Sequence, residues 1–475
     1  MLAAIIDAAL RGDLTREQAE RLAALGTEAV VLFSLTLNQR VAELQAAAPG
    51  PATPSAMVPV YHKPAASKRR RKKKPGAKDG HAGTRRKTPP EIDAREVHRL
   101  AACPCCGGVL QRCQRPRTRI IEDIPREITP VVTEHTIHRD YCPGCRKHVE
   151  PVVPDAMPNA TLGHHVVALS SWFHYGLGVT ISQTRDILAS PLHATVTAGG
   201  LVDAWGRMAA ALRPWYEQIA EQLRNTACLH ADETGWRVDG TTHWLWCFCD
   251  TRTCLYLIDR SRGGPALRRF FTEAFAGTLV SDFWAAYEQV ACDDRQYCLV
   301  HLLRELEKVD ERNRSAAWTA FAKLLRRLLR DGIRLRKRPD FSVEKYRSRI
   351  LLINRRLNKL ADDATGGGHA DADVRRLGER ISRHRDHLFT FLDKVEVPFE
   401  NNHAERQVRP AVILRKNILC NRSPGGADTQ AVLMSVFRTL KLRGLDPTQT
   451  IASALRELLQ TGTLPPLPVE TVADG

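Results

Sequence analysis

The chain has 475 residues, with 70 lysines and arginines against 53 aspartates and glutamates, so its formal net charge is +17. With 43% hydrophobic and 26% charged residues, the composition excludes a wholly disordered chain, a collagen-like repeat and a disulfide miniprotein, and the length favours about three domains. Residues 61–150 hold 22 basic and 10 acidic side chains, which places +12 of the charge in one fifth of the chain. This clustering predicts a polyanionic partner, nucleic acid first, with plain solubility as the alternative.

The sequence predicts a cytoplasmic protein without a membrane partner. No segment approaches the ~20 apolar residues that a spanning helix needs, and the first ten residues lack the basic leader of a signal peptide. In a reducing compartment the 13 cysteines are expected to be thiols or metal ligands rather than a disulfide scaffold.

The N-terminal region, residues 1–48, is predicted to be helical. Thr15 and Gln18 have the spacing of a capping box for a short helix that ends near Gly26. A second amphipathic helix is indicated by apolar residues spaced by three and four positions, namely Val30, Phe33, Leu37, Val41 and Leu44. The apolar face of this helix either mediates self-association or packs on the body of the protein.

Residues 49–92 are predicted to form a flexible basic arm. A proline- and alanine-rich stretch leads into seven consecutive cations, and such a run repels itself and has no apolar face. We expect the arm to contact DNA phosphates, which gives affinity without sequence reading; a solvated linker is the alternative. The expected DNA-binding residues are Lys68, Arg69, Arg70, Arg71, Lys72, Lys73, Lys74, Arg85, Arg86 and Lys87.

Two turns of the Cys-Pro-x-Cys type predict a zinc ribbon within residues 93–152. The two pairs can supply the four ligands of one tetrahedral, structural Zn²⁺, and the alternating residues 128–137 between them favour ribbon strands. The predicted ligands are Cys103, Cys106, Cys142 and Cys145. Cys105 and Cys113 are further thiols that could replace a ligand, and cysteines without metal are the alternative.

Residues 153–226 are predicted to be helical and either to bind DNA or to pack on a core. Residues 176–179 interrupt two amphipathic runs, which describes a helix-turn-helix as well as any helical hairpin. In the first case the second helix would present Ser182, Gln183, Thr184 and Arg185.

A mixed sheet is predicted over residues 227–300, where the helical period changes to alternation. The expected elements are strands at 227–233, 242–250 and 253–258, a turn region at 235–240, a helix at 264–275 and a strand at 278–281. This is the order of a ribonuclease H-like mixed sheet, in which Asp232 and Asp282 lie side by side. Because adjacent carboxylates repel unless a cation lies between them, the pair predicts Mg²⁺, which prefers hard oxygen ligands.

A third carboxylate is expected in residues 396–420. Glu405 lies on the first turn of a helix that Asn402 can cap, and the same spacing describes a capping box without any metal. Glu400 is a rival ligand. Nearby cations suited to a phosphodiester are Arg406, Arg409, Arg415 and Lys416.

The remaining segments are predicted to be helical. Residues 301–395 are dense in leucine, arginine and lysine, and we expect a helical insertion that contacts DNA or another protomer, or else a spacer bundle. Residues 421–475 are a C-terminal helical region. Trp236 and Trp284, beside the two aspartates, are expected either in the core or stacked on a flipped base.

Several motifs occur in a specific order between Lys74 and Pro447. They are Lys-Pro-Gly with Gly-His-x-Gly at 74–83, the two cysteine turns, His-Ala-Asp-Glu-Thr-Gly-Trp at 230–236, Ser-Asp-Phe-Trp-Ala-Ala-Tyr at 281–287, Cys-Leu-Val-His-Leu-Leu-Arg at 298–304, Asn-Asn-His-Ala-Glu-Arg at 401–406, Arg-Lys-Asn at 415–417 and Thr-Leu-Lys-Leu-Arg-Gly-Leu-Asp-Pro at 439–447. With this ordered set the chain resembles transposases of insertion-sequence family sixty-six (TnpC type), which are DDE recombinases.

The resemblance implies a multidomain α+β protein, whose ribonuclease H-like core carries a helical insertion and follows a zinc ribbon and N-terminal helices. It implies the catalytic triad Asp232, Asp282 and Glu405, with two Mg²⁺ or Mn²⁺ ions, for DNA cleavage and strand transfer. Cys298 and His301 match a secondary Cys-x-x-His element, for ligation or for packing near the site.

The partners implied are element-end and target DNA, further copies of the chain on that DNA, and accessory proteins from the same element in a bacterial cytoplasm. Two alternatives are a ribonuclease H-like nuclease that does not join strands and a zinc-dependent DNA-binding regulator.

Overall fold

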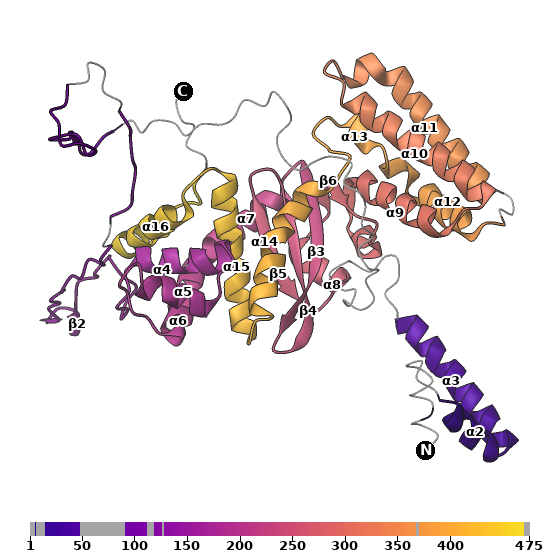
Figure 1. Cartoon of the computed structure of the whole chain (residues 1–475), viewed down its shortest axis with the longest axis horizontal. Coiled ribbons are helices and arrows are strands. Elements are labelled where there is room, and N and C mark those ends of the chain that lie inside the picture. The colour runs from indigo at the N-terminus through magenta and orange to yellow at the C-terminus, as the bar shows by residue number, and fades with distance from the viewer. Residues whose placement is uncertain are drawn as a thin grey trace.

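The computed structural model describes residue 5 and residues 15–47, 91–111, 118–125, 128–366 and 370–469. Cys113 and all ten cations predicted to bind DNA in the basic arm lie outside the described residues. The described chain is a mixed α/β protein with one large mixed sheet and many helices (Figure 1). No helix in the described ranges is long and apolar enough to cross a membrane.

A five-stranded sheet with the order β5-β4-β3-β6-β7 forms the centre of the molecule. Its strands are β3 (Cys228–Val238), β4 (Thr241–Cys249), β5 (Cys254–Asp259), β6 (Phe275–Ser281) and β7 (Cys292–Tyr297). The first three pair antiparallel, whereas β6 pairs parallel with β3 and β7 pairs parallel with β6. The predicted order of the first four strands is therefore observed, and β7 is an addition that its polar sequence Cys-Asp-Asp-Arg-Gln-Tyr did not reveal.

Two predicted boundaries near this sheet were wrong. The turn region expected at 235–240 shrinks to Asp239 and Gly240, which both have positive φ, because β3 continues to Val238. The helix expected to reach position 275 is α8 (Gly264–Phe270), since the backbone is already extended at Phe271. At this point both rings pack on Phe248 of β4, with Phe270 stacked at 4.0 Å and Phe271 edge-on at 5.7 Å between ring centres.

The helices before the sheet are α4 (His164–Ser171), the π-helical turn η2 (Trp172–Gly176), α5 (Ile181–Ala189), α6 (Ala198–Ala211) and α7 (Arg213–Arg224). On α5, Gln183 forms a capping box with Thr180, the Thr184 hydroxyl donates to the Thr180 carbonyl, and Arg185 Nε donates to the Val196 carbonyl at 3.0 Å. Three of the four side chains considered for base contact thus serve local structure, which favours the packing interpretation.

The edge strand β5 is covered by helix α15 (Pro424–Leu442), which precedes α16 (Pro447–Thr461). The Tyr256 N–H donates to Ser435 Oγ at 2.8 Å, and the Cys254 N–H donates to Thr439 Oγ1 at 3.1 Å. Both hydroxyl-bearing side chains are fully buried. They satisfy backbone groups that would otherwise leave an open sheet edge.

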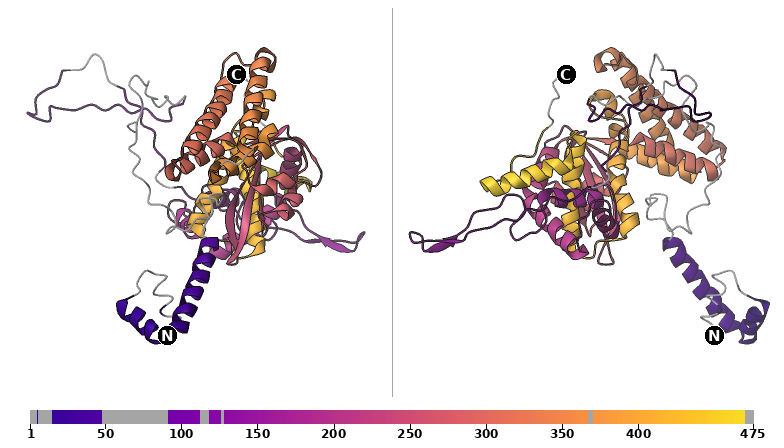
Figure 2. Two further views of the ribbon diagram at one scale, coloured as in Figure 1. Left: turned by 90° about the vertical axis from the view of Figure 1, so that its right-hand side faces the viewer. Right: turned by 60° about the vertical axis from the view of Figure 1, so that its left-hand side comes forward.

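Between β7 and α14 (Asn402–Ile418) lie α9 (Leu299–Arg312), α10 (Ala316–Arg336), α11 (Val343–Thr365), α12 (Ala372–His384), the 3₁₀ turn η4 (Arg385–His387) and α13 (Thr390–Asp393). These helices share a hydrophobic core that is separate from the main one and includes Leu306, Trp318, Leu357 and Phe391. Figures 1 and 2 show them gathered at one side of the sheet, opposite to α16.

At the N-terminal end, the predicted helices are observed as α2 (Arg16–Ala24), with the Thr15–Gln18 capping box, and α3 (Thr27–Ala47). The prediction of strands at 128–137 was wrong. The only strands described in residues 91–152 are those of the hairpin formed by β1 (Asp140–Cys142) and β2 (Lys147–Val149). The alternating residues have no neighbouring strand to pack against, and Val131 and Val132 are more than 90% exposed.

Replacing Thr439 by valine should lower the free energy of unfolding by about 1–3 kcal/mol, because it leaves the buried Cys254 N–H without an acceptor. Urea denaturation followed by tryptophan fluorescence measures the change. Thr319→Val, at an exposed position of α10, is the matched control and should change stability by less than about 0.5 kcal/mol. Equal effects of the two substitutions would contradict the edge-covering role of α15.

Candidate active site

The sheet register relates the two predicted aspartates, of which Asp232 lies on β3 and Asp282 follows directly after the last residue of β6. The parallel pairs of β3 and β6 run from Cys228 opposite Thr278 to His230 opposite Val280, a constant offset of 50 residues. Asp232 and Asp282 have the same offset and lie two residues beyond the last pair. The strand order and this offset agree with the prediction that Asp232 and Asp282 lie side by side.

Glu405 approaches the aspartates from α14, which packs on β3 and β4. Burial raises the pKa of Asp232 well above its usual value, and the charges of Glu233, Asp282 and Glu405 raise it further. Burial also raises the pKa of Asp282; the Trp284 N–H and the nearby arginines partly offset this effect. The three predicted acids therefore share one electrostatic neighbourhood, although they come from three separate segments.

The acids do not converge on a single point. Among the residues that the structure describes, no three His, Cys, Asp or Glu side chains lie close enough together to hold one metal ion. Glu405 Oε1 instead lies 3.5 Å from His301 Nε2 and 3.4 Å from Arg304 Nη1. The donor set still suits a hard divalent cation, because three carboxylates with unfavourable mutual charge are the kind of ligand that Mg²⁺ relieves and prefers.

The start of α14 differs from the sequence prediction. The N-cap residue is Asn401, Asn402 is the first helical residue, and Asn401 makes no side-chain capping bond. Glu405 is therefore the fourth helical residue and takes part in no capping box. The capping-box interpretation of this spacing was wrong.

The side chain of Asn401 connects α14 to the strand that carries Asp232. This residue is 1% exposed; its Nδ2 donates to the Ala231 carbonyl at 2.8 Å, and its Oδ1 lies 2.9 Å from His230 Nδ1. Its backbone N–H donates to Cys298 Sγ at 3.2 Å. Sequence reasoning missed this residue, and the only available signal was the doubled asparagine of the motif.

Cys298 and His301 have different surroundings. The Cys298 N–H donates to the Ser281 carbonyl, next to Asp282, and burial raises the pKa of its thiol to about 11, so Cys298 joins β6 to the start of α14 as a neutral thiol. His301 faces Glu405, and its buried Nδ1 has no hydrogen-bond partner in the described chain. Burial lowers the pKa of His301, whereas the charge of Glu405 raises it.

A buried ion pair beneath the aspartates was also missed. Glu233 accepts from Arg262 Nη2 at 3.0 Å and from the Tyr287 hydroxyl at 2.7 Å. The guanidinium of Arg262 lies between the rings of Trp244 and Trp284, 4.4 and 3.9 Å from their centres. This arrangement fixes a cation close enough to Asp282 to lower its pKa.

The two tryptophans beside the aspartates have structural partners. Trp284 Nε1 donates to the Arg262 carbonyl at 3.1 Å, and Trp236, which is 1% exposed, donates to Asn421 Oδ1 at 2.6 Å. Both contacts favour the core interpretation over base stacking.

The four cations predicted on α14 fall into two groups. Arg406, Arg409 and Lys416 are exposed. Arg415 is half-buried and donates to Thr234 Oγ1 at 3.1 Å and to the Gly235 carbonyl, so it fastens α14 to β3.

The cysteine turns are formed locally but not joined. The Cys103 N–H donates to the Gly108 carbonyl at 2.9 Å, and the pKa of the Cys103 thiol is lowered by hydrogen bonds from the backbone of Cys105 and Cys106. Hydrogen bonds from Cys145 lower the pKa of Cys142 in the same way. The two pairs do not come together as a four-ligand group in the described residues.

Comparison with known proteins decides the family. The sequence profile described as Transposase IS66 family matches residues 160–429, more than half of the chain, and this range contains all three acids. The chain belongs to the Transposase IS66 family. Family membership implies a function in transposition and binding to DNA.

Two relatives of this IS66-family transposase come from Sinorhizobium fredii. The uncharacterized protein y4hP is 22% identical over 395 residues, which cover 75% of this chain and 70% of y4hP. The uncharacterized protein y4jD is 23% identical over 400 residues, which cover 76% of this chain and 75% of y4jD.

Removing the Asn401 side chain should destabilise the transposase by about 2–4 kcal/mol, because the substitution to alanine leaves the buried Ala231 carbonyl and His230 ring without their partners. Asn402→Ala is the matched control and should cost less than about 0.5 kcal/mol. Urea denaturation measures both. A larger loss at Asn402 than at Asn401 would restore the capping-box interpretation.

Proposed function

We propose that this IS66-family transposase cuts phosphodiester bonds at the ends of its insertion sequence and joins the freed 3′-OH to target DNA. Asp232, Asp282 and Glu405 are the catalytic residues of this proposal. The observation that carries it is the geometry of the acids within the matched family range: Asp232 and Asp282 share the 50-residue offset of the β3–β6 pairing, and Glu405 comes from α14, which packs on β3. The order and directions of the five strands are consistent with a ribonuclease H-like core.

The three carboxylates would hold two Mg²⁺ or Mn²⁺ ions. When bound, such ions activate the attacking water or 3′-OH and stabilise the leaving oxygen. The chain itself supplies a positioned set of acids, held in register by the pairing of β3 with β6 and by the hydrogen bonds of Asn401.

The cations around the acids would receive the DNA. Arg304 is about half exposed and now pairs with Glu405, so it can exchange this carboxylate for a phosphate when DNA arrives. Arg406, Arg409 and Lys416 are exposed on α14 and suit neighbouring phosphates. Arg415 would act indirectly, because its bonds to β3 hold the helix that carries Glu405.

The proposal also includes self-assembly on DNA through α3. Three apolar residues outside the predicted row of Val30, Phe33 and Leu37 carry this proposal. Val31, Leu32 and Leu35 are each more than half exposed and give the helix an apolar surface that a second copy could cover.

The test of the chemistry uses the full chain, labelled element-end DNA, a target plasmid and Mg²⁺ or Mn²⁺. The wild type should give joined products, and Asp282→Asn should lower their yield by about 10²-fold or more. Glu400→Gln, which alters the rival carboxylate, is the control and should retain activity. Nicked DNA without joined product would indicate a nuclease, and binding without cleavage would indicate a regulator.

We propose in addition that Cys103, Cys106, Cys142 and Cys145 bind one structural Zn²⁺ by bringing the two preformed turns together. The protein purified without chelators should then contain about one zinc per chain by mass spectrometry, and Cys142→Ser should lose it. Cys292→Ser, at a cysteine of β7, is the control. A zinc-free wild type would refute the site and leave the catalytic proposal intact.

A further inference from the structure

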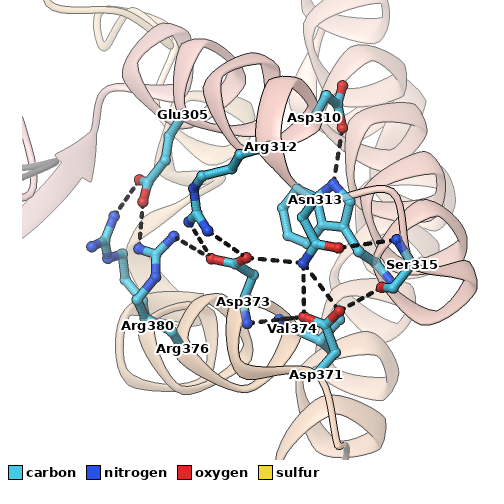
Figure 3. A network of polar contacts seen from close by, with 11 residues as sticks. Glu305, Asp310, Arg312, Asn313, Ser315, Asp371, Asp373, Val374, Arg376 and Arg380 are labelled. Carbon is cyan, nitrogen blue, oxygen red and sulfur yellow. Dashed lines mark hydrogen bonds and ion pairs between the residues drawn. The ribbon is translucent and has the colours of Figure 1, made fainter.

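The arginines of the helical insertion divide into two groups by their partners. Figure 3 shows the first group, where Glu305 accepts from Arg376 and Arg380, and Asp373 accepts from Arg312. Hydrogen bonds from Asn313 and Ser315 to Asp371 complete this network between α9, α10 and α12. Each of these arginines is neutralised by a carboxylate within the bundle.

The outward face of α10 is different. Five exposed cations follow one another at spacings of four, three, four and four residues, which places them along one side of the helix and just beyond its end. They are Lys323, Arg327, Arg330, Arg334 and Arg338. We call this set the α10 stripe. At ~1.5 Å per residue it is about 22 Å long, the length of about six phosphates along one DNA strand.

The stripe ends in a cleft of about 310 Å³ between α10 and α11. Its rim carries Arg334 and Arg338 from the stripe and Arg349 and Arg356 from α11, and its floor is apolar, with Leu335 and Ile353 each 5% exposed.

Few carboxylates oppose these cations. Asp331 lies within ion-pair distance of Arg327, Arg334 and Arg356. Asp340 pairs with Arg338. The stripe and the two rim arginines of α11 thus present seven cations to these two acids, so they keep a strong positive potential at the surface.

The C-terminal end of α10, where the stripe ends, contacts the segment that leads into α14. Arg336 Nη2 donates to the Val395 carbonyl at 2.5 Å, and Lys337 Nζ lies 5.2 Å from the centre of the Phe399 ring. The Phe399 carbonyl in turn accepts from the Leu299 N–H at the start of α9. A strand of DNA on the stripe would therefore run toward the residues that carry Glu405.

We propose that the α10 stripe and its cleft form a second DNA-binding site, which holds the phosphodiester backbone of duplex DNA outside the catalytic acids. The inference rests on the proposed function in taking DNA as the substrate, and it adds a site that neither the acids nor the basic arm supplies. Guanidinium groups suit this ligand, because they pair with phosphate oxygens through two hydrogen bonds. These contacts are to the sugar-phosphate backbone of the DNA, so the site provides affinity and orientation but does not read the base sequence.

The test compares two double variants of the full chain with equal loss of charge. Arg334→Gln with Arg349→Gln removes two exposed cations from the site. Arg347→Gln with Arg375→Gln removes two exposed cations elsewhere in the insertion, and glutamine keeps helix propensity in all four positions. Fluorescence anisotropy with a labelled element-end duplex, between about 50 and 200 mM salt, gives affinity and salt dependence.

The site variant should bind DNA about tenfold more weakly than the wild type. The slope of the logarithm of its binding constant against the logarithm of the salt concentration should fall by about 2 in magnitude, while the control variant stays close to the wild type. Hydrogen exchange should show protection of α10 by the duplex in the wild type and its loss in the site variant. Unchanged binding, or equal losses in both variants, would overturn the proposal. If the wild type cleaves and joins DNA while the site variant binds normally, the second site fails and the proposed function stands; a wild type that binds no duplex refutes both.

Discussion

Burial of carboxylates that repel one another is the constraint on which the candidate active site depends. Burial raises the pKa of both Asp232 and Asp282, and neighbouring carboxylates raise that of Asp232 further, so these acids would separate or take up protons if they were free to do so. The fold holds them together through groups that are not acidic. The parallel pairing of β3 with β6 positions Asp232 relative to Asp282, and the side-chain amide of Asn401 holds the helix that carries Glu405 against β3.

The same constraint explains the cations that surround the acids. Arg262 lies between two tryptophans and pairs with Glu233, so its charge is fixed near Asp282 and cannot leave. Arg304 is more exposed and contacts Glu405 from another helix. A fixed guanidinium lowers the repulsion permanently, whereas a mobile one can exchange its carboxylate for a phosphate. The site therefore combines a permanent neutralising charge with one that is available to an incoming ligand.

Local patterns predicted much of this arrangement. Alternating apolar residues located β3 to β5, and the order of elements placed Asp232 beside Asp282, because parallel neighbours with a constant offset leave little freedom. The start of α14 was not predictable in this way. Asn401 and Asn402 are both good capping residues, and the choice between them depends on the Ala231 carbonyl, more than 150 residues away in the sequence. β7 was missed for a similar reason, since its polar side chains Asp294 and Gln296 find their partners in η4 and α13 rather than in a simple apolar face.

The charge distribution distinguishes a DNA-binding insertion from a spacer bundle. Outside residues 61–150 the remaining 385 residues have a net charge of only +5, which suggests an almost neutral body. In the structure this near-neutrality is an average over unlike regions: acids gathered at the candidate active site and paired with arginines in the α9–α12 network, and cations along α10 that outnumber their acids. A spacer bundle would need only the first kind of arginine, the kind that a carboxylate neutralises. Cations in excess of their acids along one helix face add repulsion to the fold, so a polyanionic ligand gives them a role that a spacer does not.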